Sequence, residues 1–204
     1  MNINFETASK YLKEGDVLLF KGRGLISSFI KRAGEGKYSH VGIASLHDDI
    51  WECVEFREWK GGRSVNLEKY VNICGCDIDV YRPISMRKII IAKTLATIEE
   101  RDIPFDGRLV TKRMRKVTSL PYGWKRIWWI ATHKIPILRW LYNIDSVTND
   151  KHKEMIYPIC STAVAHAFNS IGFDLVQNRS DEWVEPSDIS TSNLLFYIFT
   201  IKKP

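Results

Sequence analysis

The chain has 204 residues, of which 45% are hydrophobic and 12% aromatic, and its formal net charge at pH 7 is +6. This length corresponds to one sizeable domain, residues 1–204, and the apolar content excludes a chain that is disordered throughout. The four cysteines do not form a disulfide scaffold in a chain this long, and the Cys74-x-Cys76 pair lacks the second pair of ligands typical of a zinc site.

The order of predicted elements indicates an α+β protein built on a meandering antiparallel sheet. Apolar runs and alternation predict strands, and helical spacing with stop residues predicts helices. The expected elements are, in order, a short amphipathic helix (5–13), a continuous apolar strand (15–22), a short helix (25–32), a hairpin of two strands (37–46 and 50–59) turning at Asp48-Asp49, a strand (76–83), a helix capped by Ser85 (86–100), a helix starting at Cys160, and a C-terminal strand (194–202).

The apolar runs are too short to cross a membrane, which needs about 18 consecutive residues. The longest is LLFYIF, near the C-terminus. The first residues, MNINFETASK, are polar and lack the basic-then-apolar order of a signal peptide. We therefore expect a protein kept in the cytoplasm, a reducing compartment, unless another route exports it.

One region differs from the rest in composition. Residues 108–153 carry 11 Lys or Arg against 2 Asp, a local net charge of +9, so that the remainder of the chain sums to −3. Six Trp and Tyr residues lie among these charges, and two prolines divide the region into short helical pieces. The composition of this insertion, residues 108–153, predicts contact with an anionic membrane or cell-wall polymer. The alternative is that the insertion forms a helical flap whose aromatic residues pack on the core. Binding to nucleic acid is disfavoured because no recognition motif accompanies the charge.

The stretch YPICSTAVAHAFNSIGF, residues 157–173, places a lone thiol at the start of a predicted helix. Apolar residues recur at helical spacing from Ala163 to Ile171, and Gly172 ends the pattern. Unpaired N–H groups and the helix dipole favour an anion at a helix N-terminus, so the thiolate form of Cys160 is favoured there. The alternative interpretation is that Cys160 is one more small buried hydrophobic residue.

A thiolate nucleophile needs a base, and that base needs a partner that fixes its tautomer. Among the histidines, His40 is the candidate base because it lies within a strand between small residues; a satisfied core or surface histidine is the alternative. The others lie beside a predicted turn (His47), in the basic insertion (His133 and His152) or on another face of the Cys160 helix (His166).

The acid partner of His40 would come from the returning strand of the hairpin. This strand contains Glu52 and Glu55, which are an odd number of residues apart and therefore point to opposite faces of the sheet. Only one of them can address His40, and residue parity leaves the choice open.

Several motifs in this order resemble the YiiX/YebB-like group of circularly permuted, NlpC-type, papain-like cysteine hydrolases. The motifs are GDVLLF, KYSHVGIA, VEF before Leu67, IPFD and CSTAVAHAF, over about residues 13–83 and 102–190. In this permuted group the histidine strand precedes the cysteine helix, as it does here. The resemblance implies Cys160 as nucleophile and His40 as general base. It points to Glu55 as third member because Glu55 lies nearer the spacing of the group to Leu67.

Two features depart from the pattern of the group. The basic insertion is longer than expected, and Thr162 stands where the group often has an acid soon after the cysteine. Both features bear on the substrate more than on the mechanism.

The resemblance implies a permuted papain-like fold in which an antiparallel, barrel-like sheet packs against the helix that carries Cys160. It implies a hydrolase that cleaves an amide or ester bond through an acyl-enzyme, on a cell-wall peptide or an N-acyl or lipid substrate. No metal or organic cofactor is required for this chemistry. The alternatives are an acyltransferase of the same fold, as in lecithin:retinol acyltransferase, and a non-catalytic module that binds membrane or wall polymer through residues 108–153.

Overall fold

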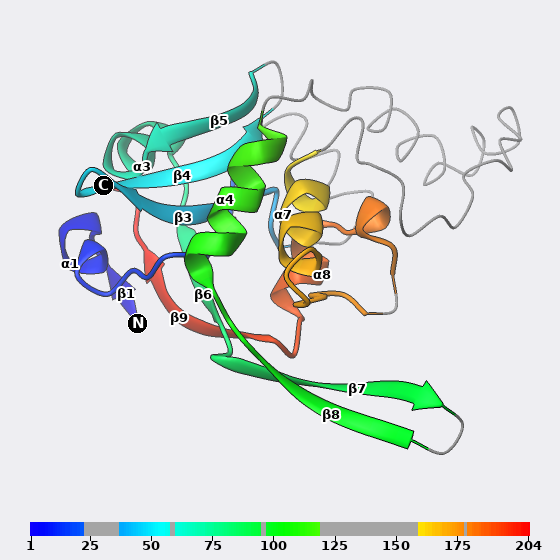
Figure 1. The fold of residues 1–204 in the computed structure, drawn as a ribbon. Helices are drawn as coiled ribbons and strands as arrows, with labels where there is room; N and C mark the ends of the chain where they lie inside the picture. The colour runs from blue at the N-terminus through cyan, green and yellow to red at the C-terminus, as the bar shows by residue number, and fades with distance from the viewer. Residues whose placement is uncertain (23–36, 58–59, 95–96, 119–158, 178) are drawn as a thin grey trace, which may run out of the picture.

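A computed structural model describes residues 1–22, 37–57, 60–94, 97–118, 159–177 and 179–204 of the chain (Figure 1). Its elements, in chain order, are β1 (Asn2–Ile3), α1 (Phe5–Ser9), β2 (Val17–Phe20), β3 (His40–His47), β4 (Ile50–Arg57), β5 (Gly61–Asn66), α3 (Leu67–Cys74), β6 (Ile78–Pro83), β7 (Met86–Thr94), β8 (Thr97–Pro104), α4 (Gly107–Val117), α7 (Cys160–Asn169), the 3-10 helix η1 (Asp181–Trp183), α8 (Pro186–Ser190) and β9 (Leu195–Ile201). The predicted helix at residues 25–32 lies outside the described residues.

Seven strands form one sheet in the order β1-β9-β6-β2-β3-β4-β5, and every neighbouring pair is antiparallel except β1 with β9. Strand β2 is central and all four of its residues are buried, as its continuous apolar sequence predicts. The turn at Asp48-Asp49 joins β3 to β4, and both aspartates have positive φ, 47° and 59°, as a tight two-residue hairpin turn requires. The α+β class and the antiparallel meander expected from the sequence are thus confirmed.

Helices cover both faces of this sheet (Figure 1). On one face, Val41 and Ile43 of β3 belong to the same core cluster as residues of α4 and α7. On the other face, Ala44 packs in a second cluster with residues of α1 and α3. The alternation along β3 therefore matches the two-residue period of the sequence, with Val41 and Ile43 on one side and Ala44 on the other.

The helix predicted over residues 86–100 is wrong: this segment contributes to a two-stranded hairpin of β7 and β8, which projects away from the main sheet (Figure 1). The two strands pair from Met86 opposite Pro104 to Thr94 opposite Thr97. The segment is rich in Ile and Thr, including the run Ile89-Ile90-Ile91. Branching at Cβ restricts χ1 in a helix and favours strands, so the local preference outweighed the apparent helical spacing.

The basic insertion is described only at its start. Helix α4 begins behind Asp106, whose side chain accepts a hydrogen bond of 3.0 Å from the Leu109 N–H. One face of α4 is buried through Val110 and Met114, whereas Lys112 and Arg113 are exposed. The rest of the insertion, residues 119–153, lies outside the described residues. Within the part of the chain that is described, none of the helices is both long and apolar enough to span a membrane.

Candidate active site

Cys160 is the first residue of α7, as the sequence predicts. The helix packs its small residues, Ala163 and Ala167 among them, against the inner strands, and all but one of its first nine residues are buried. The chain leaves the helix through Gly172, whose φ of 85° is favourable for glycine. Cys160 itself is 6% exposed. As the first helical residue, Cys160 belongs to the turn whose N–H groups have no partner within the helix.

The start of α7 is held by Thr162. Its hydroxyl oxygen accepts a hydrogen bond of 2.9 Å from the Ile159 N–H, one residue before the cysteine. A side chain at the third helical position that reaches back to the capping residue is one half of a capping box, a role more often filled by Glu or Gln. Thr162, at which the chain departs from the expected acid, thus fixes the backbone that carries Cys160.

His40 is the first residue of β3 and is 7% exposed. It lies opposite Phe20 of β2, and the two ring centroids are 5.1 Å apart. Its Nε2 lies 2.5 Å from Oε2 of Glu55 on β4. The Cys160 side chain also acts on this ring, since its proximity raises the pKa of His40. The imidazole therefore lies between a carboxylate and a thiol that is 120 residues further along the chain.

The register of β3 and β4 places Glu55, rather than Glu52, beside His40. Glu55 lies opposite Gly42, which shares the His40 face of β3, and its side chain is completely buried. Glu52 lies opposite Ser45 and is paired at 2.5 Å with Arg115 of α4. The choice that residue parity leaves open is decided by how the two strands align.

Two residues that the sequence analysis did not single out hold the Glu55 carboxylate. Arg63 on β5 donates to Oε1 from Nε at 2.8 Å and from its terminal nitrogen at 2.5 Å. The Tyr70 hydroxyl on α3 donates to Oε2 at 2.9 Å. Arg63 is directly opposite Glu55 in the β4–β5 pairing, so a cross-strand charge pair was the signal that could have identified it.

These contacts determine the charge states of the buried pair. Burial alone would raise the pKa of Glu55, but the charge and hydrogen bond of His40, followed by those of Arg63, hold it well below its usual range. Burial alone would lower the pKa of His40, but the charge of Glu55, followed by the charge and hydrogen bond of Cys160, raises it well above its usual range. The geometry therefore favours an ionised carboxylate next to an imidazolium ring that faces the sulfur.

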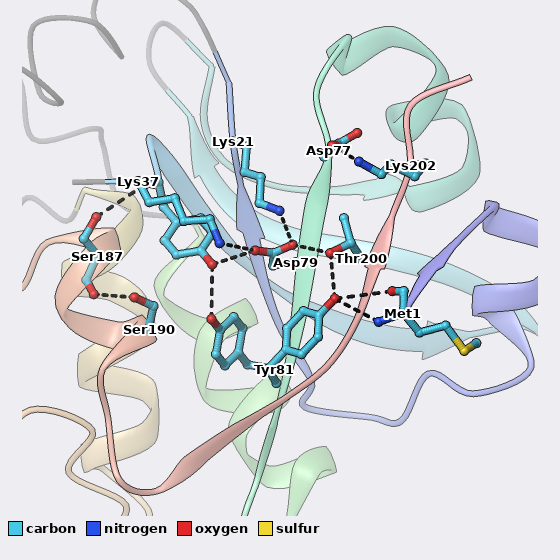
Figure 2. Close-up of polar contacts among 12 residues, drawn as sticks. Met1, Lys21, Lys37, Asp77, Asp79, Tyr81, Ser187, Ser190, Thr200 and Lys202 are labelled. Carbon is cyan, nitrogen blue, oxygen red and sulfur yellow. Dashed lines mark hydrogen bonds and ion pairs between the residues drawn. The ribbon is translucent and has the colours of Figure 1, made fainter.

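The chain that leads into His40 is anchored by a buried aspartate of β6, Asp79 (Figure 2). The Tyr38 hydroxyl donates to Asp79 Oδ2 at 2.6 Å, and Lys21 is paired with Oδ1 at 2.5 Å. The Thr200 hydroxyl of β9 also donates to Oδ1, at 2.5 Å. Burial would raise the pKa of Asp79, but the hydrogen bonds from Lys21, Thr200 and Tyr38 lower it, so the carboxylate remains charged. The segment two residues before His40 is thus tied to the centre of the sheet.

The other described histidines lie away from this group. His47 is exposed next to the β3–β4 turn and lies 3.4 Å from Asp48. His166 is partly exposed near the end of α7 and lies 3.7 Å from Asp181. Both placements agree with the sequence analysis, whereas His133 and His152 fall outside the described residues.

A seven-stranded sheet, a helix that begins with a thiol, and a buried histidine–carboxylate pair characterise this α+β protein. Its fold is similar to that of the metalloprotein YiiX from Escherichia coli O157:H7, as seen in a crystal structure. The match has a TM-score of 0.58 and 13% sequence identity, and covers 94% of this chain and 97% of that chain. No protein-family profile matches the chain, and no curated protein matches it.

Within the described segments, no three His, Cys, Asp or Glu side chains are grouped so that they could hold a metal ion. At 13% identity the likeness to YiiX concerns the fold alone.

Proposed function

We propose that this protein is a thiol hydrolase with a permuted papain-like, NlpC-type fold, which cleaves an amide or ester bond through an acyl-enzyme on Cys160. The observation that carries the proposal is the position of His40. Its Nε2 is bonded to Glu55, and the same ring interacts with the Cys160 side chain. Since Glu55 occupies Nε2, Nδ1 is the nitrogen left to exchange a proton with the sulfur.

The proton movements follow from this arrangement. The thiol proton resides on His40, which is then the imidazolium described above, and the Cys160 sulfur attacks the carbonyl carbon, so that a C–S bond forms and the carbonyl electrons move to oxygen. When the tetrahedral intermediate collapses, the bond to nitrogen or oxygen breaks and His40 gives its proton to the leaving group. Water then attacks the thioester while His40 accepts a proton from it, and the C–S bond breaks as the acid leaves. The proton on His40 stays paired with the Cys160 sulfur, which restores the resting pair.

Two structural features support this sequence of steps. The backbone N–H of Cys160, at the N-terminus of α7, is a donor for the developing oxyanion. Glu55 is buried, charged and held by Arg63 and Tyr70, so it keeps the imidazole in one tautomer without itself taking a proton.

The resemblance to the YiiX/YebB-like group implies the substrate class, and the charge of the basic insertion favours an anionic setting. We propose a cell-wall peptide or an N-acyl or lipid amide, presented at an anionic membrane or wall polymer that the insertion at 108–153 contacts. Lys112 and Arg113 are exposed on α4, in the described part of this insertion. Binding to vesicles of anionic phospholipid should weaken with salt and with Lys112→Glu plus Arg113→Glu, because both changes reduce the attraction between opposite charges.

Reactivity of Cys160 tests the catalytic proposal directly. Iodoacetamide at pH 7 should alkylate Cys160 about tenfold or more faster than it alkylates a free cysteine, because the sulfur lies at a helix N-terminus and beside His40. His40→Ala should remove this advantage. His47→Ala is the matched control, because that histidine is exposed and away from the site, and it should leave the rate unchanged.

A panel of activated acyl esters then separates the functions. A hydrolase should show a transient mass increase at Cys160 and release the free acid, whereas an acyltransferase should pass the acyl group to an added amine or alcohol. If Cys160 reacts no faster than a free thiol and His40→Ala has no effect, the enzyme proposal fails and a non-catalytic binding module remains.

A further inference from the structure

Two cysteines outside the candidate active site lie in contact at the end of α3. Cys74 is the last residue of the helix and Cys76 follows after one glycine. The two sulfur atoms are 3.3 Å apart, and Cys76 donates a hydrogen bond to the Cys74 sulfur. Cys74 is half-buried and Cys76 is 9% exposed, so the pair lies at the edge of the core rather than deep within it.

The backbone allows these sulfurs to be bonded. Cα atoms two residues apart can be separated by at most about 7.6 Å, and Cα distances in disulfides are about 4.4–6.8 Å. Gly75 between them has a φ of 60°, a left-handed conformation that ends the helix and turns the chain back. A disulfide needs the sulfurs at about 2.05 Å, so rotation of the two side chains has to close a gap of only about 1 Å.

The surroundings give the two thiols different roles. The hydrogen bond from Cys76 lowers the pKa of Cys74, and the positive charge of Arg57 lowers it further. The same hydrogen bond raises the pKa of Cys76. When Cys74 is protonated, its S–H can donate to the carbonyl of Val71 at 3.5 Å or of Cys76 at 3.4 Å. Cys74 is therefore the thiol that ionises first and attacks, and Cys76 is the one that resolves.

We propose that Cys74 and Cys76 form a redox-active dithiol that closes to an intramolecular disulfide by exchange with a low-molecular-weight disulfide such as glutathione disulfide. The Cys74 thiolate attacks one sulfur of that disulfide and releases one thiolate, which leaves a mixed disulfide on Cys74. Cys76 then loses its proton and attacks the Cys74 sulfur, releasing the second thiolate. The protein loses two electrons and two protons, and the small disulfide is reduced to two thiols.

This dithiol does not depend on the proposed hydrolase activity, but it is connected to the same part of the molecule. Arg57, whose charge acts on both sulfurs, also donates a hydrogen bond to the Tyr70 hydroxyl. Tyr70 in turn donates to Glu55. Because the test below measures mass rather than activity, its result is independent of whether Cys160 is catalytic.

The test equilibrates the full-length reduced protein in glutathione buffers of increasing oxidised fraction, followed by acid quenching, alkylation and mass analysis. The tryptic peptide 70–87 contains both cysteines and neither of the other two. We expect this peptide to lose two hydrogen atoms, and with them both alkylation sites, in most molecules of the oxidising buffers. Under reducing conditions Cys74 should be alkylated at least about tenfold faster than Cys76.

Single variants assign the roles. Cys76→Ser should stop at a glutathione adduct on Cys74, and Cys74→Ser should leave Cys76 largely unmodified. Cys160→Ser is the matched control and should leave the oxidation of peptide 70–87 unchanged. The proposal is overturned if both thiols persist in the most oxidising buffer, if the wild-type protein accumulates only the glutathione adduct, or if Cys74 pairs with Cys53 instead of Cys76.

Discussion

The charge on Glu55 is the feature that most directly tests the account of the His40 site. Glu55→Gln keeps the size and hydrogen-bonding shape of the side chain but removes its negative charge. In the wild-type protein that charge opposes the burial of His40, which alone would lower the pKa of the ring. Without it, burial should dominate and the imidazole should become neutral at a lower pH.

The size of this effect follows from the contact itself. The Nε2–Oε2 distance is 2.5 Å and the carboxylate is completely buried, so the hydrogen bond is one between charged groups. Such bonds contribute about 1.5–3 kcal/mol, and one pH unit of pKa corresponds to about 1.36 kcal/mol. The pKa of His40 should therefore fall by about one to two pH units. The step in the pH profile of Cys160 alkylation that follows the charge of the ring should move down by the same one to two pH units, because the ring beside the sulfur loses its proton at a lower pH.

The assay is an NMR titration of the histidine ring protons, combined with the rate of Cys160 alkylation as a function of pH. Glu52→Gln is the matched control, since it lies on the same strand but pairs with Arg115. Removing one charge from a buried pair costs about 3–5 kcal/mol, so circular dichroism must show that the variant is folded. Glu55→Asp, which retains the charge, should recover part of the effect. An unchanged His40 titration in folded Glu55→Gln protein would show that the Glu55 charge does not control the pKa of the ring.

Three further predictions concern stability. The first compares a Cys160→Ala protein with the same protein carrying His40→Gln as well, by urea unfolding over a range of pH. The stabilisation due to His40 should be complete below pH 6.5 and lost as pH rises through its raised pKa, so the two free energies of unfolding should converge at high pH. A difference that stays constant with pH would contradict the pKa shift. Tyr38→Phe should lower the free energy of unfolding in urea by about 1.5–3 kcal/mol, because the buried Asp79 carboxylate loses a hydrogen-bond donor. An unchanged free energy would mean that the bond from Tyr38 to Asp79 does not stabilise the fold. A Cβ on Gly42 would lie 2.5 Å from the Cys53 sulfur, so Gly42→Ala should lower the free energy of unfolding by about 1–3 kcal/mol, and adding Cys53→Ala should restore part of that loss. If the effects of the two substitutions in thermal unfolding are strictly additive, this clash is excluded.

Local sequence patterns were enough to place several parts of the site. The apolar spacing after Cys160 and the stop at Gly172 correctly predicted a helix that begins with the thiol. The two aspartates at 48 and 49 correctly predicted the turn that brings β4 back along β3. These signals are readable because each depends on residues that are close in the chain. The helix predicted at 86–100 failed where β-branched residues favoured strands over an apparent helical pattern.

The partners of the carboxylate could not be read in the same way. The local sequence does not distinguish Glu55 from Glu52 as the partner of His40, and only the alignment of β3 with β4 brings Glu55 to the face of His40. Tyr70 reaches Glu55 from a helix, and Asp79 holds the segment before His40 from another strand. Such contacts arise from strand register and packing between distant segments, which no local pattern encodes.

The amino-acid sequence by itself determined the α+β class, the strand that carries His40 and the helix that starts at Cys160, because periodicity and turn chemistry act over a few residues. The tertiary structure alone decided which carboxylate meets the imidazole and which side chains keep it charged. It also placed the two sulfurs of Cys74 and Cys76 in contact. Those outcomes depend on how strands align and helices dock, and the free energy that selects one register comes from burial of the whole core rather than from any single segment.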